Sequence, residues 1–155
     1  MADLADRPIR VLFLCTSNSA RSQMAEALLR HYGGDRFEVH SAGTHPREQI
    51  HPLTEVVMRA INISLVGQYP KGLDEVGAAG WDYIITTCDQ AKEACPVFPE
   101  DPEHIHWGFE DPARVEGSEE AQLRAFRRVR DEIKRRAMLF IELPVHRARI
   151  RVSVR

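Results

Sequence analysis

The sequence predicts a single α/β domain with a central four-stranded parallel sheet and helices on both faces. Two observations favour this class. Short runs rich in β-branched and aromatic residues alternate with segments of helical periodicity. The first run is apolar without alternation, as expected of a strand that is buried on both faces. A chain of 155 residues is also of ordinary size for one domain.

Strands and helices are expected in alternation along the chain. The strands are expected at Ile9–Cys15, at 36–43, at 81–88 and, as a short run, within 103–109. The helices are expected at 22–32, ended by Gly33 and Gly34, at 53–60, opened by Pro52, and at 118–143, with Ser118 as N-cap. We place the domain at residues 9–143, between an N-terminal extension at 1–8 and a basic tail at 144–155, either a disordered arm or an edge strand.

Composition and charge are those of a soluble globular protein. Apolar residues make up 43% and charged residues 28%, with a net charge of −2, so nothing indicates a nucleic-acid partner. The N-terminal segment is acidic and lacks an apolar export signal, and no apolar run is long enough to cross a membrane. We therefore expect a cytoplasmic protein. Its three cysteines, an odd number, indicate thiol chemistry or plain burial rather than a disulfide framework.

The first strand ends at Cys15, and a run of small residues separates it from the next helix. This run consists of Thr16, Ser17, Asn18, Ser19 and Ala20. Its backbone N–H groups can converge on one point, and the helix N-terminus and the Arg21 guanidinium make that point suited to a tetrahedral oxyanion. The same field favours a Cys15 thiolate, to which Ser22 can donate a hydrogen bond. Taken alone, the spacing fits an inert buried cysteine equally well.

Several separated motifs together resemble one protein family. The loop "CTSNSARS" is similar to the phosphate-binding loop of the low-molecular-weight tyrosine phosphatase fold, and "LCTSNSARSQMAEALL" resembles its thioredoxin-coupled arsenate reductase branch. Four further stretches resemble that branch in order and spacing: "VHSAGTHP", "TTCDQAKEACPVFP", "HWGFEDPA" and "FRRVRDEIKRR". The resemblance implies reduction of arsenate to arsenite, with Cys15 as nucleophile, Arg21 as anion clamp, Asp111 as general acid, and Cys88 and Cys95 as the redox relay.

The implied relay uses all three cysteines in turn. Cys88 attacks the sulfur of the Cys15–arsenate adduct and expels arsenite, and Cys95 then attacks Cys88 and frees Cys15. Thioredoxin, kept reduced by thioredoxin reductase and NADPH, would reduce the remaining disulfide, so no bound cofactor is expected. Asp111, in a turn fixed by Pro112, would stay protonated beside an anion, although Glu110 competes for this role and a plain turn aspartate is the alternative.

The spacing of the second and third cysteines carries a structural consequence. Cys88 and Cys95 are seven residues apart, so in a helix their Cα atoms would lie about 10.5 Å apart. A disulfide tolerates only roughly 4.4 to 6.8 Å. Any helix between them must therefore open on oxidation. We expect the segment 88–102 to be a mobile redox segment whose second half, which contains Pro96, Pro99 and Pro102, is not helical.

Competing functions remain open at this point. Zinc could use Cys88, Cys95, His104 and His106, but the spacing matches no zinc finger, so no metal is expected. A phosphatase of the same fold and a non-enzymatic thiol sensor are two further candidate functions. The "EDPA" motif lacks the aromatic residues that follow Asp-Pro in the phosphatases and line their phosphotyrosine cleft, which favours the reductase.

Two departures from the family pattern concern the loop and a cation site. Asn18, Glu26 and Ser41 match positions that help to bind potassium in some members, but Lys71 stands near the position of the carboxylate that completes that site. Because a lysine ammonium could replace the cation, potassium dependence is not predicted. Ala20 replaces a cysteine found in some members, which leaves the three relay thiols intact.

Overall fold

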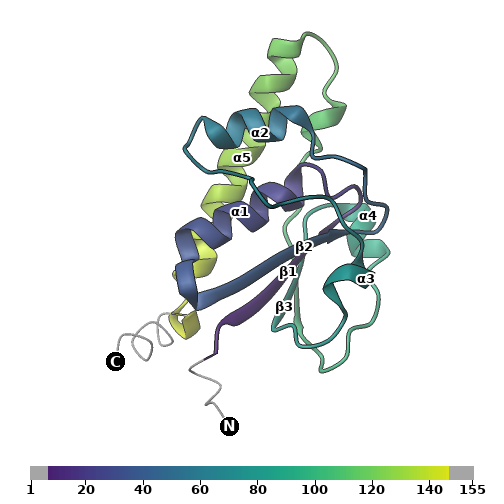
Figure 1. The fold of residues 1–155 in the computed structure, drawn as a ribbon, viewed down its shortest axis with the longest axis vertical. Coiled ribbons are helices and arrows are strands. Elements are labelled where there is room, and N and C mark those ends of the chain that lie inside the picture. The colour runs from purple at the N-terminus through teal and green to yellow at the C-terminus, as the bar shows by residue number, and fades with distance from the viewer. Residues whose placement is uncertain (1–6, 147–155) are drawn as a thin grey trace.

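Four parallel strands form the central sheet of the protein (Figure 1). The structure is a computed structural model that describes residues 7–146. The strands are β1 (Ile9–Cys15), β2 (Phe37–Gly43), β3 (Tyr83–Thr86) and β4 (Glu103–His106), in the order β2-β1-β3-β4. In register, Cys15 of β1 lies opposite Gly43 of β2, and Leu14 lies opposite Thr86 of β3. The predicted four-stranded parallel sheet is therefore confirmed.

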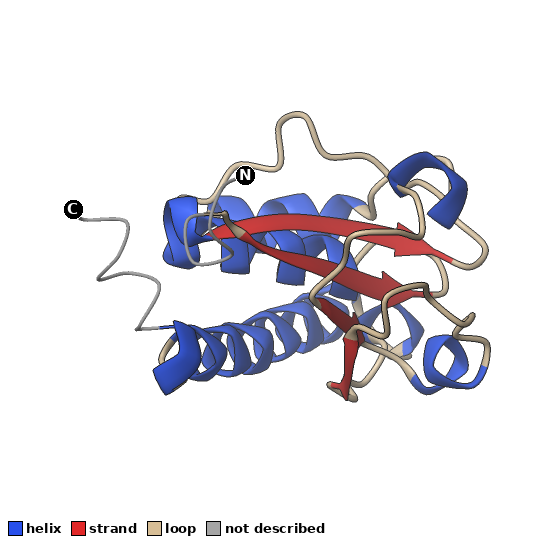
Figure 2. Ribbon diagram, turned by 90° about the horizontal axis from the view of Figure 1, so that it is seen from below, coloured by secondary structure: helices blue, strands red, loops and turns tan. Residues whose placement is uncertain are grey.

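Helices cover both faces of this sheet, as the apolar first strand predicted (Figure 2). Three helices pack on one face: α1 (Arg21–Gly33), α2 (Pro52–Arg59) and α5 (Glu119–Ile141). The short helices α3 (Leu73–Val76) and α4 (Asp89–Glu93) lie on the other. Successive residues of a strand point to opposite faces, so Val11 and Phe13 join the first core, while Leu12 and Leu14 join the second. Two 3₁₀ turns, η1 (Gly34–Arg36) and η2 (Pro112–Arg114), complete the fold.

The ends of the predicted helices agree with the structure to within a few residues. Gly34 ends α1 with a φ of 60°, which a residue without a side chain adopts freely. Ser118 caps α5 by accepting a hydrogen bond from the Ala121 N–H at 3.1 Å. The four-residue α3 was not predicted.

The C-terminal part of the described chain returns to the core. His146 is fully buried, and its ring packs against Phe37, Tyr83 and Phe140. The sequence prediction placed this histidine in the basic tail. The rest of that tail and most of the N-terminal extension lie outside the described residues.

The strand order decides where loops diverge. After β1 the chain continues to β2 on one side, and later it enters β3 on the other side, so the loops that follow β1 and β3 separate at the carboxyl edge. Cys15 is the last residue of β1, and Cys88 follows β3 by two residues. The two thiols therefore flank the position at which ligands bind in sheets of this kind.

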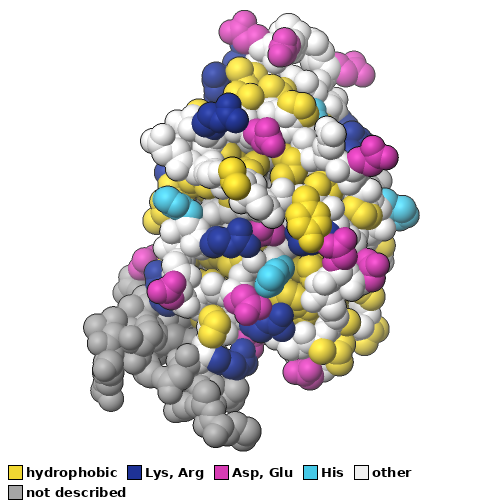
Figure 3. Space-filling view, viewed as in Figure 1, with side chains coloured by type: hydrophobic (Ala, Val, Ile, Leu, Met, Phe, Trp, Pro, Cys, Tyr) yellow, Lys and Arg dark blue, Asp and Glu magenta, His cyan; other side chains and the backbone are white. Residues whose placement is uncertain are grey.

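The molecular surface agrees with the small net charge. On the face shown in Figure 3, basic and acidic side chains are interspersed, and neither sign forms a continuous patch. Within residues 7–146, no helix combines the length and the apolar character that a membrane span requires.

Candidate active site

The loop from Cys15 to Ala20 is held from outside by the segment that follows β2. Backbone N–H groups of this segment donate to loop carbonyls: Thr44 to Cys15 at 3.0 Å, His45 to Thr16 at 2.8 Å, Arg47 to Ser17 at 3.0 Å and His51 to Ser19 at 3.0 Å. With its carbonyls engaged outward, the loop can turn its own N–H groups inward. Among the described residues, no side chain caps the N-terminus of α1 at Ala20, so the first-turn N–H groups are available to an anion.

Two hydrogen-bond partners contact the sulfur of Cys15, which is 2% exposed. The N–H of Asn18 donates to Cys15 Sγ at 3.1 Å, and Ser22 Oγ lies 2.9 Å from the same sulfur. Asn18 has a φ of 50°, a left-handed conformation that asparagine tolerates better than most residues and that turns its N–H toward the sulfur. Both contacts are made to the sulfur that the sequence predicts as the nucleophile.

Arg21 and Asp111 lie side by side at the mouth of the loop. Arg21 Nη2 is 3.6 Å from Asp111 Oδ2, and Arg21 Nη1 donates to the Phe109 carbonyl at 3.2 Å. Asp111 also accepts a hydrogen bond from the Ala113 N–H at 3.0 Å and so caps η2. Glu110, the competing acid, is half exposed and instead pairs with Arg128 at 3.0 Å. The structure thus brings Asp111, and not Glu110, to the arginine.

The three cysteines belong to one side-chain cluster on the α4 side of the sheet. Cys15 and Cys88 are among its buried members, Cys95 packs against it, and all three are free thiols. Cys88 caps α4: its sulfur accepts from the Ala91 N–H at 3.4 Å and lies 3.4 Å from Thr16 Oγ1. Partial burial raises the pKa of the Cys95 thiol above its usual range.

In the segment 88–102, the prediction that the second half is not helical is confirmed. The first half of this segment is helix α4, and its second half, through Pro102, has no helix. Cys95 Sγ lies 3.9 Å from His104 Nδ1, and His106 pairs with Asp89 at 3.0 Å. Among the described residues, no group of three or more His, Cys, Asp or Glu side chains is placed to hold a metal ion.

A polar network behind the loop includes residues that sequence reasoning did not select. Gln23 is fully buried, and its amide nitrogen lies within 3.0 Å of Asn18 Oδ1 and of the Tyr69 carbonyl.

His51 caps α2 by accepting from the Leu53 N–H at 3.1 Å. Burial lowers the pKa of His51, and the nearby Arg47 acts in the same direction, whereas Asp111 opposes them. The only sequence signal for this cap was the following Pro52 at the start of a helix.

Known proteins are similar to this chain in both sequence and fold. Residues 10–149 match the low molecular weight phosphotyrosine protein phosphatase family. An arsenate reductase of Halalkalibacterium halodurans is 41% identical over 132 residues, which cover 85% of this chain and 94% of that protein.

Solved structures agree with this relationship. An arsenate reductase of Archaeoglobus fulgidus superposes with a TM-score of 0.70 and 29% identity, over 86% of this chain and 99% of that one. A thioredoxin-dependent arsenate reductase of Corynebacterium glutamicum superposes with a TM-score of 0.60 and 32% identity, over 88% of this chain and 65% of that one. The chain therefore belongs to the low molecular weight phosphotyrosine protein phosphatase family and, within it, groups with the arsenate reductases.

Proposed function

We propose that this protein is an arsenate reductase that converts arsenate to arsenite through a relay of Cys15, Cys88 and Cys95. The observation that carries the proposal is the clustering of all three thiols beside a loop suited to an oxyanion. A phosphatase needs the loop, the arginine and the acid, but it has no use for two further thiols. The names of the similar proteins support the same activity.

In the proposed first step, the Cys15 thiolate attacks the arsenic atom of arsenate, and one oxygen leaves as water. The loop N–H groups and Arg21 hold the remaining oxygens. Without a ligand, Asp111 lies 3.6 Å from the Arg21 guanidinium. In this proposal Asp111 is the general acid that delivers a proton to the leaving oxygen.

Electron transfer follows by thiol exchange. Cys88 attacks the Cys15 sulfur, the S–As bond breaks with its electron pair on arsenic, and arsenite leaves as a Cys15–Cys88 disulfide forms. Cys95 then attacks Cys88 and releases the Cys15 thiolate. A dithiol protein such as thioredoxin reduces the Cys88–Cys95 disulfide, with electrons from NADPH through thioredoxin reductase. Free thiols and this electron source fit a reducing, cytoplasmic location.

Three single variants test the relay. Arsenite is measured with arsenate, thioredoxin, thioredoxin reductase and NADPH, first over many turnovers and then in one turnover without thioredoxin. Cys15→Ser and Cys88→Ser should give no arsenite in either assay. Cys95→Ser should give about one arsenite per protein in the single turnover and then stop, because its Cys15–Cys88 disulfide is not passed on.

Two results would contradict the proposal. Sustained arsenate reduction by Cys95→Ser with thioredoxin would exclude the relay in this order. Hydrolysis of a phosphate ester that needs Cys15 alone, with no arsenite from arsenate, would instead identify a phosphatase.

A further inference from the structure

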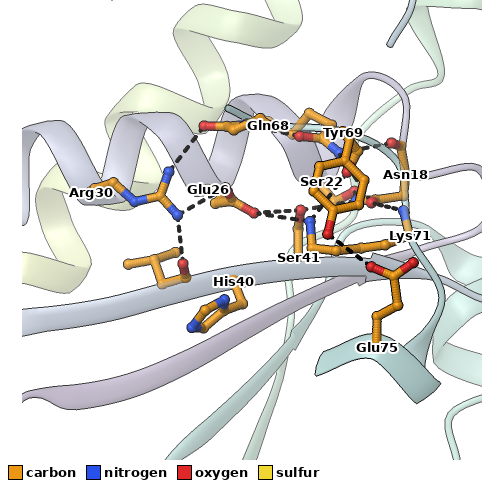
Figure 4. A network of polar contacts seen from close by, with 12 residues as sticks. Asn18, Ser22, Glu26, Arg30, His40, Ser41, Gln68, Tyr69, Lys71 and Glu75 are labelled. Carbon is orange, nitrogen blue, oxygen red and sulfur yellow. Dashed lines mark hydrogen bonds and ion pairs between the residues drawn. The ribbon is translucent and has the colours of Figure 1, made fainter. Parts of the chain in front are cut away.

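A buried carboxylate lies behind the loop and carries two cationic partners (Figure 4). The Glu26 side chain is 4% exposed, and its Oε2 accepts a hydrogen bond from Arg30 Nη2 at 2.8 Å. Lys71 Nζ lies 3.8 Å from Glu26 Oε1 and 3.2 Å from the Tyr69 carbonyl, with the Lys71 side chain 10% exposed. The cluster therefore holds one more positive than negative charge.

A chain of hydrogen bonds links this cluster to Cys15, and its direction is fixed. The backbone N–H of Lys71 can only donate, and it donates to Asn18 Oδ1 at 3.0 Å. The other end of the Asn18 side chain is therefore the NH₂ group, which donates to Ser22 Oγ at 2.8 Å and to Ser41 Oγ at 3.0 Å. Ser22, already an acceptor, is left to donate its own proton to the Cys15 sulfur.

The same direction holds on the side of the carboxylate. Ser41 accepts from Asn18 and donates to Glu26 Oε1 at 2.7 Å. Glu26 as a carboxylate accepts only, so it ends the chain. A change of charge in the cluster therefore affects Cys15 in two ways: through space, and through the hydrogen-bonded side chains of Ser41, Asn18 and Ser22.

This site does not fit the potassium ion that some members of the family bind at the matching positions. Asn18, Glu26 and Ser41 are present. However, the Lys71 ammonium lies beside the Glu26 carboxylate, in the position that a potassium ion would need. Arg30 already engages the other carboxylate oxygen. A further cation would meet two positive charges and a single negative one.

We propose that Lys71 is a built-in cation that replaces potassium and acts as a positioning residue for Cys15. Its ammonium balances buried Glu26 and favours the thiolate. Its backbone N–H, together with the Gln23 amide, orients Asn18 so that Ser22 donates to the sulfur. The inference rests on the proposed role of Cys15 as a nucleophile, but not on the identity of the substrate.

The test measures the thiolate directly, without arsenate. In a Cys88→Ser/Cys95→Ser background, Cys15 is the only remaining thiol of the chain. Its rate of alkylation by iodoacetamide is followed by mass spectrometry between pH 6 and pH 9. Lys71→Met should slow alkylation at neutral pH by about threefold to tenfold, since one nearby positive charge is lost. Lys71→Arg should restore the rate, and Lys134→Met, the same change on α5, should leave it unaltered.

Two further measurements separate charge from structural damage. Glu26→Gln removes a negative charge but keeps a carbonyl acceptor for Ser41, so alkylation should be as fast as before or faster. If Glu26→Gln and Lys71→Met both slow the alkylation of Cys15, the effect comes from general damage to the network and not from the charge. The proposed role of Lys71 as a cation is then wrong. In the protein with native Lys71, alkylation and thermal stability should be equal in potassium and sodium chloride of equal ionic strength. A potassium-specific effect there would overturn the proposal, even if Lys71→Met failed to fold.

Discussion

Gly43 contacts the oxyanion loop, residues 15–20, so closely that a methyl group added at this position would displace the loop. A Cβ at this position would lie 2.6 Å from the Thr16 carbonyl oxygen, and 3.0 and 3.1 Å from the Cβ and N atoms of Asn18. Two of these three atoms belong to the backbone and cannot rotate away. An ordinary contact needs nearly 1 Å more than the shortest of these distances, so in Gly43→Ala the loop must shift by several tenths of an ångström.

This displacement should cost both stability and anion binding. Overpacking of this kind destabilises a fold by about 1–3 kcal/mol, and a misplacement of about 1 Å in a reactive site can cost about 100-fold in rate. Anion binding is measured as the phosphate concentration that protects Cys15 from alkylation by iodoacetamide. Stability is measured by urea unfolding. In Gly43→Ala we expect that protecting concentration to rise at least about tenfold, which corresponds to about 1.4 kcal/mol.

Gly33→Ala is the matched control. Its added Cβ would lie 2.5 Å from Phe37 Cδ2, a core ring distant in sequence from the loop. This variant should change stability while phosphate protects Cys15 as in the unsubstituted protein. If Gly43→Ala were protected at the same phosphate concentration as the unsubstituted protein, the loop would be able to absorb the methyl group, and the reasoning would fail.

Two other predictions concern pH and oxidation. Burial lowers the pKa of His51 from its ordinary value of 6.5. Below pH 6.5 the unfolded chain therefore binds this proton before the folded protein does, and the free energy of unfolding falls until the pH passes the folded pKa. Urea unfolding at several pH values should show this slope, and His51→Asn, which can still cap α2, should reduce it. Backbone amides of α4 should exchange faster in the oxidised protein than in the reduced protein, and equal exchange in both would show that α4 does not open.

Local sequence signals were sufficient for the strands and for the residues next to Cys15. The apolar run of β1 and the small residues after it are contiguous, so their arrangement depends on few distant contacts. The segment that holds the loop from outside could not be identified in this way. Its four hydrogen bonds to the loop are between backbone groups, which carry no side-chain signature, and they join residues about 30 positions apart. The partners of His146 are similarly distant, since Phe37 and Tyr83 lie on different strands.

The position of Cys88 at the start of α4 links the chemistry of the relay to a change in backbone structure. A helix of five residues is too short to be stable by itself, so it depends on its cap and its packing. The cap is the Cys88 sulfur, which accepts the Ala91 N–H. In the proposed relay this sulfur first bonds to Cys15, and it must then turn away from Ala91. In that relay, oxidation of Cys88 is expected to remove the cap of α4, which lies between Cys88 and Cys95 in the sequence. We therefore expect Cys95 to reach Cys88 only after the first disulfide has formed, which would give the proposed relay its order.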